Sequence, residues 1–144
     1  MGIDPSQTDQ LAQVITHATA PAFLLGAVSG FVAVLIGRMN GVLDRIRTIN
    51  AIAAEDDARA HLKADLPRLQ RRARLLNRAT LLAVSSAICT TLLVVLAFFS
   101  AFLGLRHEPG AAVLFVAALL LMGGALLALA LEVRIALTAY DHYA

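Results

Sequence analysis

Few residues of this sequence could do acid–base, nucleophilic or metal chemistry, and they are scattered along the chain. The single cysteine cannot form a disulfide or a metal-binding pair within one chain. No HExxH motif, nucleophile elbow, phosphate-binding glycine loop or Cys/His cluster is present. We therefore expect a protein that is not an enzyme and that holds no cofactor and no metal. The residues concerned are His17, His61, Cys89, His107 and His142.

Four charged residues stand at the ends of long apolar runs, where they could form an ion pair. A carboxylate without a partner at the edge of a membrane is costly. We predict that Glu132 pairs with Arg38 or Arg78 at a common boundary. The boundary set is Arg38, Arg78, Glu132 and Arg134.

One apolar run also carries a band of small polar side chains, which fall within an arc of about 140° on a helix. Such a face either packs against another helix or lines an ion path. We favour packing, because no charged residue or filter-like motif stands in mid-run. The band consists of Ser85, Ser86, Cys89, Thr90 and Ser100, and the glycines expected at other helix contacts are Gly26, Gly30, Gly37, Gly123 and Gly124.

Helices that cross a membrane are needed to position these residues. The chain is 59% hydrophobic and only 15% charged, whereas soluble domains have about 25% charged residues. The apolar residues form three runs, each long enough to cross a hydrocarbon core of roughly 30 Å. We predict an all-α membrane protein with transmembrane helices at 18–37, 79–105 and 111–132.

The distribution of positive charge predicts the orientation. The segment 38–78 holds ten of the twelve Lys and Arg residues and five acidic residues, a net charge of +5. Positively charged loops stay in the cytoplasm. We therefore expect a bacterial inner-membrane protein with its N-terminus outside and segment 38–78 and the tail 133–144 in the cytoplasm.

Segment 38–78 is predicted to form an antiparallel helical hairpin of coiled-coil type. Val42, Ile46 and Ile49 lie on one stripe of a helix, which indicates that the first transmembrane helix continues past Arg38. Pro67 should begin the returning helix, which we expect to run unbroken to Gly104. The turn between them is expected around residues 53–65.

The outer segments are shorter. Residues 1–17 are predicted to form an extracytoplasmic segment with an interfacial helix, followed by Thr19 as the N-cap of the first transmembrane helix. Residues 106–110 should form a short turn outside the membrane, with Pro109 in the first turn of the last helix.

A basic face is expected on the returning helix of the hairpin. Anionic lipid headgroups would attract it by about 1 kcal/mol per charge, and an acidic protein partner is the alternative. Nucleic acid is not expected, because no aromatic residues alternate with the arginines. The face consists of Arg68, Arg71, Arg72 and Arg74.

Three stretches carry a likeness to a known family: residues 21 to 45, residues 66 to 79 (LPRLQRRARLLNRA) and the EVR at 132 to 134. Through them the chain resembles the bacterial domain of unknown function family 2721. The resemblance implies a three-span inner-membrane protein with a charged cytoplasmic segment. It implies no activity and no functional residues.

Two functions remain open from the sequence. The first is ion permeation by a homo-oligomer, in which small or polar faces surround a pore and the basic hairpins form its inner mouth. The second is a non-conducting membrane scaffold or regulatory subunit that binds a partner through the hairpin. We expect a homo-oligomer, because an isolated helical pair buries little apolar area and is more stable if copies pack around an axis; the pore requires such an assembly.

Overall fold

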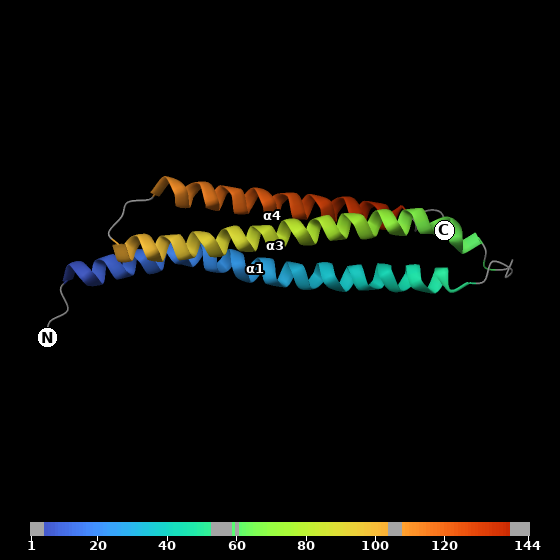
Figure 1. The fold of residues 1–144 in the computed structure, drawn as a ribbon, viewed down its shortest axis with the longest axis horizontal. Coiled ribbons are helices and arrows are strands. Elements are labelled where there is room, and N and C mark those ends of the chain that lie inside the picture. Colours follow the sequence, from blue (N-terminus) through green and yellow to red (C-terminus); the bar gives the residue numbers. More distant parts are fainter. Residues whose placement is uncertain (1–4, 53–58, 60, 104–107, 139–144) are drawn as a thin grey trace.

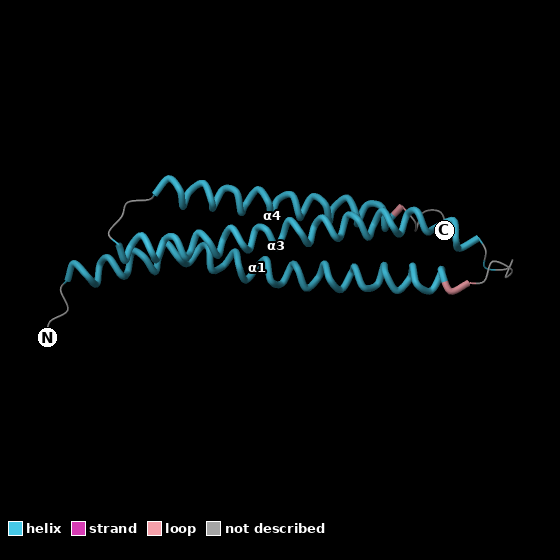
Figure 2. Tube along the Cα trace, in the orientation of Figure 1, coloured by secondary structure: helices cyan, strands magenta, loops and turns pink. Residues whose placement is uncertain are grey.

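The computed structural model describes residues 5–52, 59, 61–103 and 108–138 of the protein. These residues form the long helices α1 (Pro5–Asn50), α3 (Leu66–Leu103) and α4 (Glu108–Leu137), with the short 3-10 helix η1 (His61–Asp65) before α3. The long helices lie side by side, and α3 lies between α1 and α4 (Figure 1). Each successive long helix runs antiparallel to the one before it, and helices make up almost all of the described chain (Figure 2).

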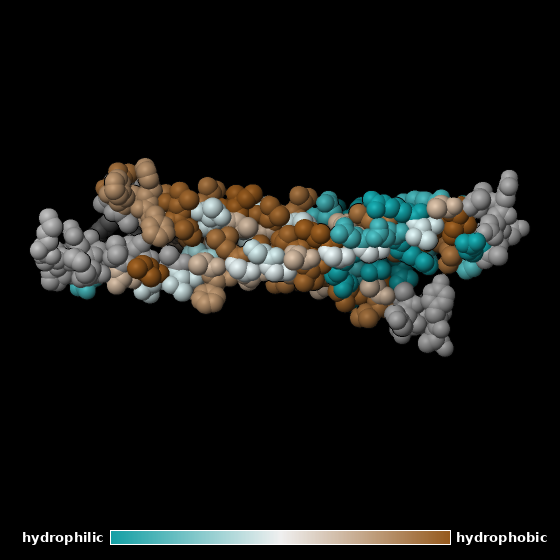
Figure 3. Space-filling model, turned by 90° about the horizontal axis from the view of Figure 1, so that it is seen from below, coloured by the Kyte–Doolittle hydropathy of each residue, from teal (hydrophilic) through white to brown (hydrophobic). Residues whose placement is uncertain are grey.

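All three long helices contain a segment that is long and apolar enough to cross a membrane, as the sequence predicts. Many of their outward side chains in these segments are large and hydrophobic, including Phe23, Leu81, Leu120 and Leu127. In the space-filling view, hydrophobic atoms cover the middle of the bundle and hydrophilic atoms gather toward the end where α1 finishes (Figure 3). We call this the charged end of the bundle.

Helix α1 does not stop at Arg38 but continues as far as Asn50, as the apolar stripe predicts. Its buried residues recur every seven positions, at Val28, Leu35, Val42 and Ile49. A spacing of seven keeps the same side of a helix turned toward its neighbour over many turns. The same contact with α3 therefore extends from the apolar segment into the charged end.

Buried residues of the other two helices follow the same spacing. In α3 they form two rows, one of Leu69, Leu76, Ala83 and Thr90 and one of Ala79, Ser86 and Leu93, and in α4 the row is Ala118, Ala125 and Glu132. Three of these core positions are polar. The polar members lie where the close-packed surfaces meet, so each of them needs a hydrogen-bond partner.

The start of α1 differs from the prediction. Thr19 is not an N-cap, because its hydroxyl donates to the carbonyl oxygen of Ile15 at 2.9 Å from inside the helix. Pro21 is also inside α1, although it lacks an N–H to donate to the preceding turn. Residues 5–17, predicted as part of a separate outer segment, belong to the same continuous helix.

The two connections agree with the sequence in part. Helix α3 begins at Leu66, with Pro67 in its first turn, and runs unbroken to Leu103. Helix α4 has Pro109 in its first turn. Residues 53–58 and 60 of the predicted turn at 53–65, Gly104, and residues 106 and 107 of the outer turn lie outside the described residues. The rest of both predicted turns differs from the prediction, because 61–65 form η1 and 108–110 already belong to α4.

Candidate functional site

A buried carboxylate joins the three long helices at the charged end. Glu132 of α4 is 0% exposed. Its Oε2 accepts hydrogen bonds from Nη2 of Arg38 at 2.6 Å and from Nε of Arg38 at 3.1 Å. Its Oε1 accepts one from Nε of Arg72 at 2.8 Å. One carboxylate thus holds two guanidinium groups, one from α1 and one from α3, and the group carries one excess positive charge.

The seven-residue rows explain why these side chains meet. Glu132 lies seven residues after Ala125 in the buried row of α4, and Arg72 lies seven residues before Ala79 in a buried row of α3. The buried row of α4 therefore ends in Glu132, and the Ala79 row of α3 continues into Arg72. Because α1 has little direct contact with α4, the Arg38–Glu132 bond is a main connection between them.

Arg38 is one of the two partners that the sequence predicts for Glu132. Arg78, the other, is exposed and makes no ion pair among the described residues, and Arg134 is also exposed. Arg72 was assigned instead to an outward basic face. Its place seven residues before Ala79 is the sequence signal that could have identified it as inward-facing.

Arg68, also assigned to the basic face, binds the end of α4. Its Nη2 donates to the carbonyl oxygen of Ile135 at 2.8 Å and to that of Ala136 at 3.5 Å. The last carbonyl groups of a helix have no partner within the helix and carry partial negative charge. A guanidinium from α3 satisfies them, so α4 is fixed to α3 beyond Glu132.

The small polar residues of α3 divide into two groups. Ser86 and Thr90 are fully buried; Ser86 donates to the carbonyl oxygen of Ala118 in α4 at 2.7 Å, and Thr90 donates to the carbonyl oxygen of Ser86 at 2.8 Å. Ser85, Cys89 and Ser100 are half-buried. The hydroxyl groups of Ser86 and Thr90 thus have partners within one chain, at the contact between α3 and α4.

The predicted packing glycines also divide. A Cβ added at Gly124 would lie 3.3 Å from Cδ1 of Leu82, so this glycine allows α3 and α4 to approach closely. A Cβ at Gly123 would meet nothing within 4 Å. The same is true of Gly26, Gly30 and Gly37, which are exposed on α1.

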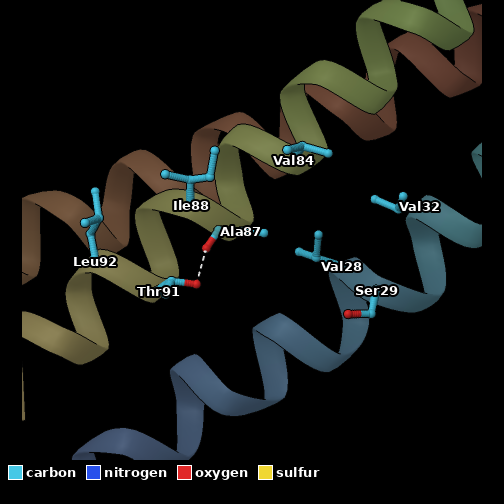
Figure 4. Close-up of a pocket in the computed structure, with 8 residues that line it drawn as sticks. All are labelled: Val28, Ser29, Val32, Val84, Ala87, Ile88, Thr91 and Leu92. Carbon is cyan, nitrogen blue, oxygen red and sulfur yellow. Dashed lines mark hydrogen bonds between the residues drawn. The ribbon is translucent and has the colours of Figure 1, made fainter.

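A groove lies between α1 and α3 within their apolar segments (Figure 4). Its volume is about 550 Å³, and its lining is mainly aliphatic. Two exposed hydroxyl groups border it, Ser29 of α1 and Thr91 of α3, and each donates to a backbone carbonyl of its own helix. The groove offers no charged or metal-binding group.

A second cleft, of about 680 Å³, lies between α3 and α4 at the charged end. Four arginines line it together with three aliphatic side chains. We call it the arginine cleft; its lining residues are Arg71, Arg74, Leu75, Arg78, Leu131, Arg134 and Ile135. It combines two residues of the predicted basic face with two of the predicted boundary set.

Metal chemistry finds no support in the part of the chain that the structure describes, which has no group of three His, Cys, Asp or Glu residues able to hold an ion. The buried carboxylate of Glu132 is already bound by two guanidinium groups. The arrangement of the described residues can therefore bind anions and hold helices together.

Comparison with known proteins gives one match. The family described as "Protein of unknown function (DUF2721)" matches residues 18–142, which confirms the resemblance seen in the sequence. No curated protein and no solved structure matches the chain.

Proposed function

We propose a function on the premise that the chain belongs to the DUF2721 family of proteins of unknown function, a membership that assigns no activity. The proposal is a non-conducting membrane scaffold or regulatory subunit that binds a partner through its charged end. This end faces the cytoplasm, and the N-terminus lies on the other side of a bacterial inner membrane.

The main support for this proposal is a difference between the polar residues in mid-span and those at the charged end. In mid-span, the buried hydroxyls of Ser86 and Thr90 are bound within the chain. At the charged end, the arginine cleft holds four guanidinium groups that make no ion pair or hydrogen bond among the described residues. Among the described residues, guanidinium groups without a partner are therefore concentrated outside the apolar segments.

Rigidity of the charged end also supports a binding role. The rows of buried residues continue through Val42 and Ile49 in α1 and Leu69 and Leu76 in α3, all beyond the apolar segments. Arg68 and Glu132 fix α4 to the same structure. A surface held in this way loses little conformational entropy when it binds.

The orientation follows from charge, because segment 38–78 has a net charge of +5 and positive segments near spans remain in the cytoplasm. Self-association is supported by α1, whose Gly26, Gly30 and Gly37 are exposed and have open space around them. Small residues at such positions let helices of two copies approach closely.

Ion permeation is the second candidate function, and one observation supports it. Ser29 and Thr91 expose hydroxyl groups along the groove between α1 and α3, where copies of the chain could surround a path. These hydroxyls already donate to their own helices. Only their lone pairs remain for an ion, which is a weak lining for a pore.

The test is co-isolation from native membranes in mild detergent, combined with ion flux from liposomes. Charge reversal of Arg71 and Arg74 to Glu should remove the bound partner and leave the oligomer mass unchanged. The matched control is Arg45→Glu with Arg47→Glu, which makes the same change in charge on exposed positions of α1. An unchanged set of partners in the cleft variant would contradict the proposal, as would ion flux that falls on Thr91→Leu.

A further inference from the structure

The arginine cleft has more positive charge than the described residues neutralise. Arg71, Arg74 and Arg78 follow one another at spacings of three and four on α3, which places them on one side of the helix. Arg134 of α4 faces the same cleft. Four like charges that share one concave surface repel one another, so a bound anion would stabilise them.

The nearby carboxylate does not supply that anion. Both oxygens of Glu132 are occupied by Arg38 and Arg72, and the carboxylate is buried inside the bundle. Among the described residues no acidic side chain lines the cleft. None of the described acidic residues therefore supplies an anion to the cleft.

The donor chemistry favours a phosphate group. A guanidinium presents parallel N–H groups that fit two oxygens of a phosphate, and several guanidiniums can share its three or four oxygens. A cleft of about 680 Å³ also has the size of a small-molecule site. The anion that best fits the arginine cleft is therefore compact and has several hydrogen-bond acceptor oxygens.

The position of the cleft favours a phosphate that belongs to a lipid. Arg72 of α3 contacts Glu132 of α4, and Ser86 of α3 contacts Ala118 of α4. The distance between these two contacts is fourteen residues on each helix, which shows a constant antiparallel register. Arg78 lies six residues, about 9 Å, closer to mid-span than Arg72. The cleft thus extends from the Glu132 layer toward the apolar segments.

An apolar surface continues directly from the cleft. Leu81 lies three residues after Arg78 on α3, and Leu127 lies four residues before Leu131 on α4. These three leucines are 51–68% exposed. A phospholipid with its phosphate among the arginines could lay an acyl chain along them.

We propose that the arginine cleft binds the phosphate of an anionic phospholipid from the leaflet at the charged end. The inference rests on the proposed function in one respect, because it needs the charged end to lie at a membrane face; the lipid is a ligand in addition to the protein partner. The lipid supplies the negative charge that the described lining residues lack, and its acyl chain covers the exposed leucines between α3 and α4.

The experiment uses the full chain in nanodiscs of phosphatidylcholine with increasing phosphatidylglycerol, and counts retained lipids by native mass spectrometry. The test variant is Arg78→Gln with Arg134→Gln, and the control is Arg45→Gln with Arg47→Gln. Both remove two positive charges, but only the first pair lines the cleft. At about fivefold per arginine, the test variant should bind phosphatidylglycerol about 25-fold more weakly. The control should stay within about twofold of the unmodified protein, because Arg45 and Arg47 lie about 10 Å or more beyond Arg38 along α1, where attraction to the lipid surface is largely screened.

Two further arms identify the source of the phosphate. Glycerol phosphate at millimolar concentration should not displace the retained lipid; displacement would overturn the lipid assignment in favour of a soluble phosphate. Binding of an acidic peptide to the cleft in lipid-free detergent, with an affinity equal to that for phosphatidylglycerol, would overturn the lipid assignment in favour of a protein ligand. Equal loss of lipid in both variants would show general charge attraction and no site.

The outcomes separate this inference from the proposed function. If lipid retention is the same in the test variant and the unmodified protein, the lipid inference fails, while co-isolation of a partner can still succeed. If liposomes show specific ion flux, the scaffold proposal fails, while lipid retention in the cleft can still be measured.

Discussion

Replacement of Glu132 by Gln should destabilise the bundle more than any other single change of similar size. The carboxylate is 0% exposed and accepts three hydrogen bonds, while the side chains of Arg38 and Arg72 are 36% and 22% exposed. Glutamine keeps the volume and one acceptor oxygen but removes the charge. Both guanidinium groups then lose their anion at the end of an apolar segment.

The expected magnitude follows from these contacts. A hydrogen bond to a charged group contributes about 1.5–3 kcal/mol, and breaking a buried pair from one side costs about 3–5 kcal/mol. Water reaches both arginines and recovers part of this energy, so we expect Glu132→Gln to lower the free energy of unfolding by about 2–4 kcal/mol. Replacing all three charges, as Arg38→Met, Arg72→Met and Glu132→Leu, should stay within about 1 kcal/mol of the unmodified protein.

The assay is unfolding in mixed micelles of a mild detergent and dodecyl sulfate. Circular dichroism follows helix content, and maleimide labelling of Cys89, the single cysteine of the chain, follows the opening of the bundle around α3. The control is Arg47→Gln. Its partner Asp44 is at 3.2 Å, and their side chains are 78% and 70% exposed, so the loss should be at most about 0.5 kcal/mol.

An unfolding midpoint of Glu132→Gln equal to that of Arg47→Gln would refute the reasoning, because it would mean that the buried carboxylate does not stabilise the bundle. A triple variant as unstable as Glu132→Gln would also count against it, since removing all the charges leaves no guanidinium without its anion.

Two smaller changes test the contact between α3 and α4. Ser86→Ala removes the hydroxyl that bonds a backbone carbonyl of α4 and should cost about 0.6–1.7 kcal/mol in the same assay, whereas Ser85→Ala, at a half-buried position, should change little; equal losses would contradict this. Gly124→Val places a side chain against Leu82, 3.3 Å from the added Cβ, and should cost about 1–3 kcal/mol, more than Gly123→Val, where the added Cβ meets nothing within 4 Å; the reverse order would show that α3 and α4 pack in another register.

The pattern of apolar residues was sufficient to predict the helices and most of their ends. Runs of uncharged residues identified the three segments that can cross a membrane, and the stripe of Val42, Ile46 and Ile49 predicted that α1 continues past Arg38. Pro67 correctly marked the first turn of α3. The predicted start at Thr19 was wrong, because Thr19 lies inside α1 and Pro21 is tolerated two residues later in the same helix.

Side-chain partners between helices needed the tertiary structure. The spacing of apolar residues along the sequence predicts on which side of a helix a residue lies, and the seven-residue rows place Arg72 and Glu132 on packed sides. It does not state how far one helix is displaced along its axis relative to the next. That displacement, set by the packing of small residues such as Ser86 and Gly124, brings Arg72 rather than Arg78 level with Glu132. It leaves Arg78 in the arginine cleft, about 9 Å nearer to mid-span.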